Sequence, residues 1–195
     1  MYICVYGASS NEIDAAYLQA GEELGRQMAA HGHGLVFGGG QKGMMGAAAR
    51  GMTAGGGEII GVAPRFFDVE GVLYQACTEF VFTETMRERK AIMEERADAF
   101  IMTPGGIGTF EEFFEILTLR QLGRHSKPIA VLNTRGYYEP LRQMLEQAIA
   151  QGFMRPECRG LCAFLEEPAE LLEYLENDKG LAVDPSKLRD VLPKA

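Results

Sequence analysis

Short apolar runs, most of them followed by glycine-rich or polar turns, recur along the chain and alternate with stretches of helical periodicity. Strands are predicted from the apolar runs, at residues 2–6, 35–37, 58–62, 79–82, 99–102, 128–132 and 161–165. Apolar residues at helical spacing, together with helix start and stop signals, predict the intervening helices. These lie at about 17–31, 43–54, from 85 onward, 110–122, 137–151 and 168–176.

The order of these elements predicts the fold class. Strands that alternate with helices and read as continuous apolar runs are typical of a parallel sheet buried on both faces. We therefore expect an α/β fold, a Rossmann-like doubly wound parallel sheet with helices on both faces. The length of 195 residues fits a single domain. We expect that domain to span residues 1–178, with 179–195 as a loosely packed tail.

Glycine-rich turns follow three of the predicted strands. They read Gly-Ala-Ser-Ser at 7–10, Gly-Gly-Gly at 38–40 and Pro-Gly-Gly at 104–106. Open α/β sheets bind ligands at the carboxyl ends of their strands, although tight turning alone also explains a glycine loop. The first two are neither the Gly-x-Gly-x-x-Gly dinucleotide fingerprint nor a Gly-x-x-x-x-Gly-Lys-Ser/Thr phosphate loop. This argues against an NAD dehydrogenase and against a P-loop kinase.

The stretch 102–123 carries the clearest chemistry. An apolar strand breaks at glycines and resumes as a helix, marked by Phe110, Phe113, Phe114 and Leu117. Glycines at such a junction expose backbone N–H groups, and a helix N-terminus carries partial positive charge. The junction therefore predicts an anion site, with phosphate as its expected occupant.

A second interpretation of the same residues stays open from the sequence. Thr109 and Glu112 have the spacing of a capping box, in which two side chains satisfy the first N–H groups of a helix. Glu111, Glu112 and Glu115 supply more acid than one cap requires. A ribose between phosphate and carboxylate would separate the two negative charges, and this favours a ligand site.

The segment 104–112, Pro-Gly-Gly-Ile-Gly-Thr-Phe-Glu-Glu, matches the pattern Pro-Gly-Gly-x-Gly-Thr-x-x-Glu. This pattern resembles the signature of the Lonely Guy (LOG) family, and the resemblance extends over roughly residues 2–175. Members of that family are cytokinin-activating nucleoside 5′-monophosphate phosphoribohydrolases, often described as lysine decarboxylases. The resemblance implies hydrolysis of the N-glycosidic bond of AMP or an N6-modified AMP, giving free base and ribose 5-phosphate.

The resemblance also implies roles for individual residues. Met86-x-x-Arg89-Lys90 matches the family pattern that supplies an essential arginine, so Arg89 and Glu112 are the expected catalytic residues. Charges at 89 and 90 would otherwise be read as a solvated helix face. The expected substrate-binding residues are Ser9, Gly39, Gly40, Met86, Lys90, Gly105, Gly106, Ile107, Gly108, Thr109, Glu111 and Thr118.

The sequence departs from the family pattern at two places. Arg87 stands where relatives often have histidine. Residues 119–123 read Leu-Arg-Gln-Leu-Gly where many relatives read Trp-Ala-Gln-Leu-Gly. The second departure lies in the region that the resemblance assigns to the base pocket and the interface.

Composition narrows the ligand classes. The formal net charge is −8, so no global positive field invites nucleic acid or an anionic membrane. No apolar run approaches the roughly 20 residues of a membrane span, and no signal peptide is evident, so a cytoplasmic protein is expected. The four cysteines show no zinc spacing and are expected to be reduced. No metal is expected, because His31, His33 and His125 show no ligand spacing with carboxylates.

Two further expectations concern assembly and the site's surroundings. The helix 110–122 is apolar on two faces, so one face needs a partner beyond the sheet. The family is commonly dimeric through this region, which implies a homodimer; burial under the C-terminal helix of the same chain is the alternative. The irregular segment 64–77 is expected to form a mobile loop over the site.

Two other functions compete with hydrolysis. A non-catalytic binder of a phosphorylated ligand, similar to molybdenum-cofactor carriers, would share the fold and the glycine loops. The joint presence of Arg89 and Glu112, which a carrier does not require, distinguishes the two. Lysine decarboxylation requires a pyridoxal-phosphate Schiff-base lysine and its partners, and no such context is recognisable. A redox cofactor is equally unsupported, so no cofactor is expected.

Overall fold

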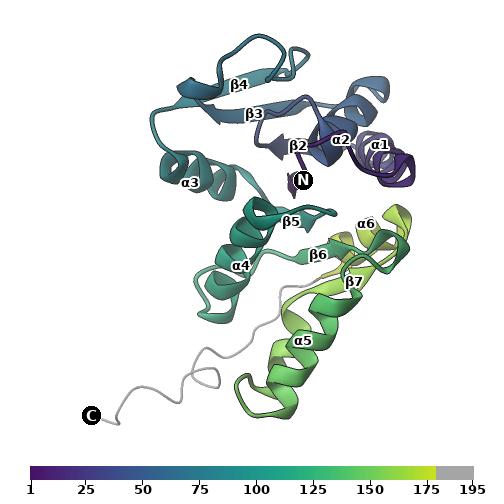
Figure 1. The fold of residues 1–195 in the computed structure, drawn as a ribbon, viewed down its shortest axis with the longest axis vertical. Coiled ribbons are helices and arrows are strands. Elements are labelled where there is room, and N and C mark those ends of the chain that lie inside the picture. Colours follow the sequence, from purple (N-terminus) through teal and green to yellow (C-terminus); the bar gives the residue numbers. More distant parts are fainter. Residues whose placement is uncertain (179–195) are drawn as a thin grey trace.

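Seven parallel strands form one sheet in the order β4-β3-β2-β1-β5-β6-β7 (Figure 1). The computed structural model describes residues 1–178. The strands are β1 (Tyr2–Tyr6), β2 (Gly34–Phe37), β3 (Ile59–Pro64), β4 (Glu79–Thr83), β5 (Ala99–Met102), β6 (Ile129–Leu132) and β7 (Ala163–Leu165). β1 pairs with β2 on one side and with β5 on the other. The strand order reverses there, and such a switch point is where open α/β sheets bind ligands.

Helices cover both faces of the sheet. Figure 1 shows α3 and α4 on one side of the strands and α1, α2 and α6 on the other. The helices are α1 (Ala15–Ala30), α2 (Gly43–Ala54), α3 (Met86–Arg96), α4 (Ile107–Gln121), α5 (Glu139–Ala150) and α6 (Pro168–Asn177). Three short 3-10 helices complete the described elements: η1 (Arg65–Phe67), η2 (Thr134–Gly136) and η3 (Pro156–Leu161). The predicted doubly wound parallel sheet is confirmed.

Side chains of the central strands alternate between two cores. Ile3 and Val5 of β1 pack in the cluster that contains buried residues of α1, α2 and α6. Cys4 and Tyr6 pack in the cluster of α3, α4 and the end of α5. Successive strand residues point to opposite faces, and here both faces are covered. This explains why the strands read as unbroken apolar runs.

The ends of several elements differ from the sequence-based expectation. α4 begins at Ile107 rather than near Phe110, and α5 begins at Glu139 after η2. The last strand is confined to 163–165 because η3 occupies the residues before it. The expected tail, 179–195, lies outside the described residues. Within residues 1–178, no helix combines the length and apolar character needed to cross a bilayer.

Candidate active site

A cavity of about 560 Å³ opens where the loops after β1, β2 and β5 meet. The first turns of α3 and α4 form part of its wall, and the segment between η1 and β4 forms another part. Its lining residues are Gly7, Ala8, Ser9, Gly38, Gly40, Gln41, Lys42, Met45, Phe67, Gly71, Val72, Leu73, Met86, Arg89, Gly106, Ile107, Gly108, Thr109, Glu111 and Glu112. The cavity therefore lies at the carboxyl edge of the sheet, where the glycine loops were predicted to gather.

Backbone hydrogen bonds fix the loop between β5 and α4. The N–H of Ala8 donates to the carbonyl of Pro104 at 3.1 Å. The N–H and the hydroxyl of Thr103 both donate to the carbonyl of Tyr6. On the other side, the hydroxyl of Tyr138 donates to the carbonyl of Thr103 at 2.8 Å. The loop is thus held between β1 and the start of α5, which orients the α4 N-terminus toward the cavity.

The N-terminus of α4 presents unpaired backbone donors. The N-cap residue is Gly106, which has no side chain to accept a hydrogen bond from the first N–H groups. The first backbone hydrogen bond of the helix runs from the N–H of Phe110 to the carbonyl of Gly106, at 3.0 Å. The N–H groups of residues 107–109 precede this bond and have no acceptor within the helix. Gly105 allows Thr109 to pack against the loop, because a Cβ at position 105 would lie 2.1 Å from the Thr109 hydroxyl oxygen. Donors of this kind at a helix N-terminus suit an anion, and the binding of an anion here stays a prediction.

The capping-box interpretation of Thr109 and Glu112 is wrong. The helix begins two residues before Thr109, so neither residue occupies the cap position. The Oε1 atom of Glu112 instead accepts a hydrogen bond from Nη2 of Arg89 at 2.8 Å. The acidic side chain is therefore committed to the cavity wall rather than to the helix start.

Arg89 and Glu112 form a buried ion pair on that wall. Their side chains are 9% and 10% exposed. Arg89 also lies against the loop after β2, since a Cβ at Gly38 would be 2.3 Å from Arg89 Nη2. The Nη1 atom contacts the sulfur of Met86 at 3.6 Å, whereas Nε has no hydrogen-bond partner among residues 1–178. The guanidinium thus retains donor capacity beside the cavity.

Burial changes the acidity of the Glu112 carboxyl. Removal from water raises its pKa to about 7, and the negative charge of Glu111 adds to the rise. The Arg89 guanidinium opposes the shift without cancelling it. A carboxyl that titrates near neutral pH is suited to proton transfer and marks this wall as a candidate for chemistry.

Most residues expected at the site meet in this cavity. Those that line it are Ser9, Gly40, Met86, Arg89, Gly106, Ile107, Gly108, Thr109, Glu111 and Glu112. Gly39, Lys90, Gly105 and Thr118 do not line it. Lys90 pairs with Glu111 and, at 2.7 Å, with Glu115. Thr118 is exposed about three turns along α4, and nothing in the described chain links it to the cavity.

The cavity also contains residues that the sequence analysis did not select. Lys42 is an exposed cation at the N-cap of α2, and its position in the run Gly-Gly-Gly-Gln-Lys-Gly was the available signal. Residues 71–73 join the wall because the N–H of Gln41 donates to the Val72 carbonyl at 3.0 Å. The expected loop over the site is therefore present, and its mobility stays a prediction.

The comparisons with known proteins identify the family. The family model described as "Possible lysine decarboxylase" matches residues 45–175, more than half of the chain. A rice protein named "Cytokinin riboside 5'-monophosphate phosphoribohydrolase LOG" is 38% identical over 174 residues, covering 89% of this chain and 72% of the relative. The chain belongs to the LOG family. The Arabidopsis thaliana family member LOG6, named a probable enzyme of the same activity, is 37% identical and covers 89% of this chain and 87% of its own.

Solved structures resemble this LOG-family chain in fold. A molybdenum cofactor binding protein from Rippkaea orientalis superimposes with a TM-score of 0.68 at 21% identity, covering 90% of this chain and 94% of the other. The molybdenum cofactor carrier protein of Chlamydomonas reinhardtii also gives a TM-score of 0.68, at 24% identity, covering 90% and 95%. At this identity the likeness concerns the fold alone.

Proposed function

We propose that this LOG-family protein hydrolyses the N-glycosidic bond of a nucleoside 5′-monophosphate. The observation that carries the proposal is the buried Arg89–Glu112 pair, which shares one cavity with the free N–H groups at the start of α4. An anion site and an acid–base carboxyl in the same cavity fit a substrate with a phosphate at one end and a reacting sugar carbon at the other. The names of the plant relatives support the same reaction.

The substrate is placed by its charge. The 5′-phosphate lies on the N–H groups of residues 107–109, with the Thr109 hydroxyl and the Lys42 ammonium as further donors. Glu112 follows Ile107 by five residues, which is about 7.5 Å along the helix axis. The ribose occupies the space between them, and the base extends toward the apolar wall formed by Met45, Phe67 and neighbouring residues of the cavity.

The chemistry follows from the positive charge that develops on the sugar. Cleavage of the bond between C1′ and the base passes through an oxocarbenium-like state, which a nearby carboxylate stabilises. In its ionised form Glu112 either faces this charge or takes a proton from the attacking water. The water oxygen bonds to C1′, the bonding electrons leave with the base, and the base gains a proton. Arg89 holds Glu112 in place and contacts the ribose or the leaving base.

Binding without turnover is the second candidate function. The likeness to molybdenum cofactor carriers favours it, since their fold is the same. The pairing of Arg89 with Glu112 favours the enzyme, because pure binding of a phosphorylated ligand gives no reason to bury a carboxylate. The description of the family model as a lysine decarboxylase finds no support in the lysines near the site: Lys90 lies outside the cavity and pairs with two carboxylates, and Lys42, which lines the cavity, is assigned to the phosphate.

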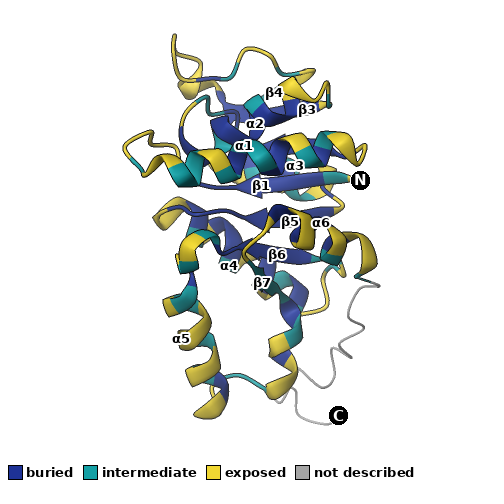
Figure 2. Cartoon of the chain, turned by 90° about the vertical axis from the view of Figure 1, so that its right-hand side faces the viewer, coloured by how far each residue is buried: buried dark blue, intermediate teal, exposed yellow. Residues whose placement is uncertain are grey.

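We infer that the protein acts as a homodimer through the α4–α5 surface. Phe113, Ile116 and Leu117 of α4 are buried within the chain, but Leu122 is 44% exposed. A groove bounded by α4, α5 and η3 is lined by Leu117, Leu145, Met154 and other apolar residues, together with the charged side chains of Arg142, Glu146 and Arg159. Figure 2 shows α5 extending from the sheet with a largely exposed outer surface. Pairing of two such surfaces would remove apolar area from water, and each Å² removed would contribute roughly 25 cal/mol of favourable free energy to association.

A nucleotide panel tests the proposed function. Purified protein is incubated with AMP, N6-substituted AMP, adenosine and ATP, without added metal or NAD, and free base is quantified by chromatography. We expect base release from the monophosphates and much slower release from adenosine and ATP, because the anion site accommodates one terminal phosphate. Equal rates with adenosine and AMP would contradict the phosphate anchor, and no base from any monophosphate would favour the carrier function.

A further inference from the structure

Three side chains meet at the edge of the sheet opposite the cavity. His31 caps the end of α1, His33 directly precedes β2, and Glu176 lies in the last turn of α6. Because His33 precedes the amino end of β2, this cluster is separated from the cavity at the carboxyl ends of the strands. The two histidines precede Glu176 by more than 140 residues, so only the fold brings them together.

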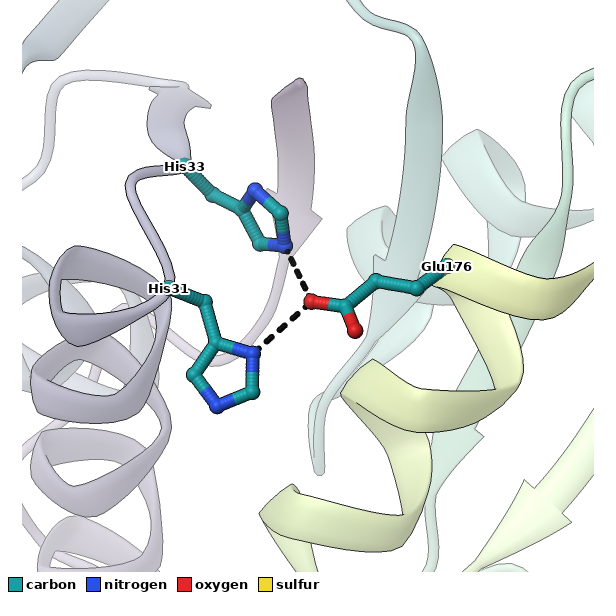
Figure 3. A group of neighbouring side chains, drawn as sticks. All are labelled: His31, His33 and Glu176. Carbon is teal, nitrogen blue, oxygen red and sulfur yellow. Dashed lines mark hydrogen bonds and ion pairs between the residues drawn. The ribbon is translucent and has the colours of Figure 1, made fainter.

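The three side chains converge on one point. Nδ1 of His31 and Nε2 of His33 each lie 2.8 Å from the same oxygen, Oε1 of Glu176. All three atoms are within 4.8 Å of one another. Figure 3 shows both rings turned toward the carboxylate, with one nitrogen of each ring directed at Glu176.

Hydrogen bonding alone is the simpler explanation of the contact. The two imidazoles lower the pKa of the Glu176 carboxyl, as hydrogen-bonded partners do. A carboxylate offers two oxygens, so two hydrogen-bond donors could each bind a separate one. Here both ring nitrogens contact the same oxygen. Convergence of two imidazole nitrogens and one carboxylate oxygen on a common point is the ligand arrangement of a three-residue metal site.

The spacing requires little change to admit an ion. Zinc bonds of about 2.0–2.2 Å to nitrogen and oxygen place tetrahedral ligand atoms about 3.4 Å apart. Each nitrogen-to-oxygen distance would therefore open by about 0.6 Å, and the two ring nitrogens, which lie within 4.8 Å of each other, would have to come to the same separation of about 3.4 Å. The His33 side chain is only 8% exposed and provides a fixed ligand. His31 and Glu176 are 45% and 34% exposed, so they are free to adjust, and solvent has access to the remaining coordination position.

We propose that His31, His33 and Glu176 bind a divalent transition-metal ion of the zinc class, completed by water. Imidazole ligands select zinc, nickel or copper over magnesium and calcium, which prefer oxygen. The sequence-based expectation of no metal rested on the lack of ligand spacing between these histidines and carboxylates along the chain. In the folded protein Glu176 lies 2.8 Å from both histidines, so this reason no longer applies. The bound ion joins the α1–β2 turn to α6 and stabilises the folded state independently of the proposed hydrolysis.

The surroundings of the site set its expected affinity. A metal-binding histidine normally donates its second ring N–H to an acceptor, and loss of such a partner weakens binding about 10–100-fold. Nδ1 of His33 is buried and has no hydrogen-bond partner among residues 1–178. Binding in the micromolar range is therefore expected. Protons compete for the imidazoles, so the affinity falls as the pH is lowered.

The test uses the full-length protein after removal of any histidine tag. Zinc chloride is titrated calorimetrically, and the Tm is measured with and without a hundredfold excess of zinc over the measured Kd. We expect one zinc per chain and a Tm rise of about 5 °C or more. Glu176→Gln and His31→Gln should each weaken binding at least tenfold and, at the same zinc concentration, reduce the Tm shift to about half of the wild-type value or less. Glu173→Gln, on the exposed surface of the same helix, should leave both unchanged.

Two controls keep the outcome interpretable. Circular dichroism confirms that the Glu176→Gln protein is folded, and Gln retains the ability to pair with the histidines. Cobalt(II) added in place of zinc reports on the ligands, since binding at the free cysteines would give thiolate charge-transfer absorption. Absence of saturable zinc binding, equal binding by Glu176→Gln, or a thiolate spectrum would each overturn the proposal.

Discussion

The Nη2 atom of Arg89 lies 2.8 Å from Oε1 of Glu112, in a pair almost entirely removed from solvent. The two residues come from the helices that precede and follow β5, and they meet beside the loop after β2. Isolated buried charges are costly, so such a pair persists only where its geometry is well supported. The surrounding cavity gives this pair a chemical role as well as a structural one.

The pH dependence of turnover should report the Glu112 carboxyl. Burial raises its pKa to about 7, and the ionised form is the one that stabilises the oxocarbenium-like state. We expect kcat/KM for a nucleoside monophosphate to rise about tenfold per pH unit below 7 and to level above it. The measurement is a pH–rate profile of the wild-type protein with AMP. A flat profile between pH 5.5 and 8.5 would contradict the assignment.

Removal of Arg89 should reduce both turnover and stability. Arg89→Ala leaves Glu112 buried without its cation, which costs about 3 kcal/mol or more of unfolding free energy when the carboxyl is ionised. A carboxyl with a raised folded-state pKa stabilises the protein below its unfolded pKa, and this contribution disappears as pH rises through the folded value. Since loss of Arg89 raises that value further, the Tm deficit relative to wild type should be larger at pH 8 than at pH 6.

Arg96→Ala provides the matched control for that variant. Arg96 lies on the same helix and pairs with Glu79, but both side chains are 45% exposed. Exposed pairs contribute about 0–1 kcal/mol, so its Tm should stay close to that of wild type at both pH values. A similar Tm loss in the two variants would show that the buried pair has no special energetic role.

Substitution of Gly108 should separate stability from substrate binding. Gly108 lies in the first turn of α4, and a Cβ there would meet no heavy atom within 4 Å. Gly108→Ala should therefore keep or raise the unfolding free energy, by up to about 1 kcal/mol. The added methyl group would crowd the donors at the helix start, so the KM for AMP should rise about tenfold or more, a loss of about 1.4 kcal/mol. An unchanged KM would move the phosphate elsewhere in the cavity.

A charged substitution at one exposed position, Leu122, should disrupt the proposed homodimer. Leu122 is 44% exposed at the end of α4, so Leu122→Asp is compatible with the folded monomer. We expect light scattering to show a dimer for wild type and a monomer for this variant at micromolar concentration. Gln19→Asp places the same charge on α1, across the sheet, and should remain dimeric. A fully active wild-type monomer would refute the dimer.

The sequence predicts the fold well where a residue pattern is compatible with a single type of secondary structure. The strands are unbroken apolar runs because both faces are buried, so their positions and the parallel sheet could be predicted. Helix starts were harder. The Thr109–Glu112 spacing fits a cap, but the helix begins at Ile107 because Gly106 and the pinned loop already turn the chain.

The site could be predicted only where a motif marks it. Arg89 and Glu112 belong to recognisable patterns, although their contact across 23 residues depends on the fold. Residues 71–73 carry no signal, because they reach the cavity through backbone hydrogen bonds to the loop after β2. Glu176 likewise meets His31 and His33 only through the packing of α6 beside α1.

The most direct test of the central claim is product analysis with the Glu112→Gln variant beside wild type. Glutamine preserves the size of the side chain and a hydrogen bond to Arg89 while removing the negative charge. Wild type should convert AMP or an N6-substituted AMP into equal amounts of free base and ribose 5-phosphate. The folded variant should still bind the nucleotide but release base at least a hundredfold more slowly. Equal turnover by both proteins, or no base release by wild type, would contradict the account.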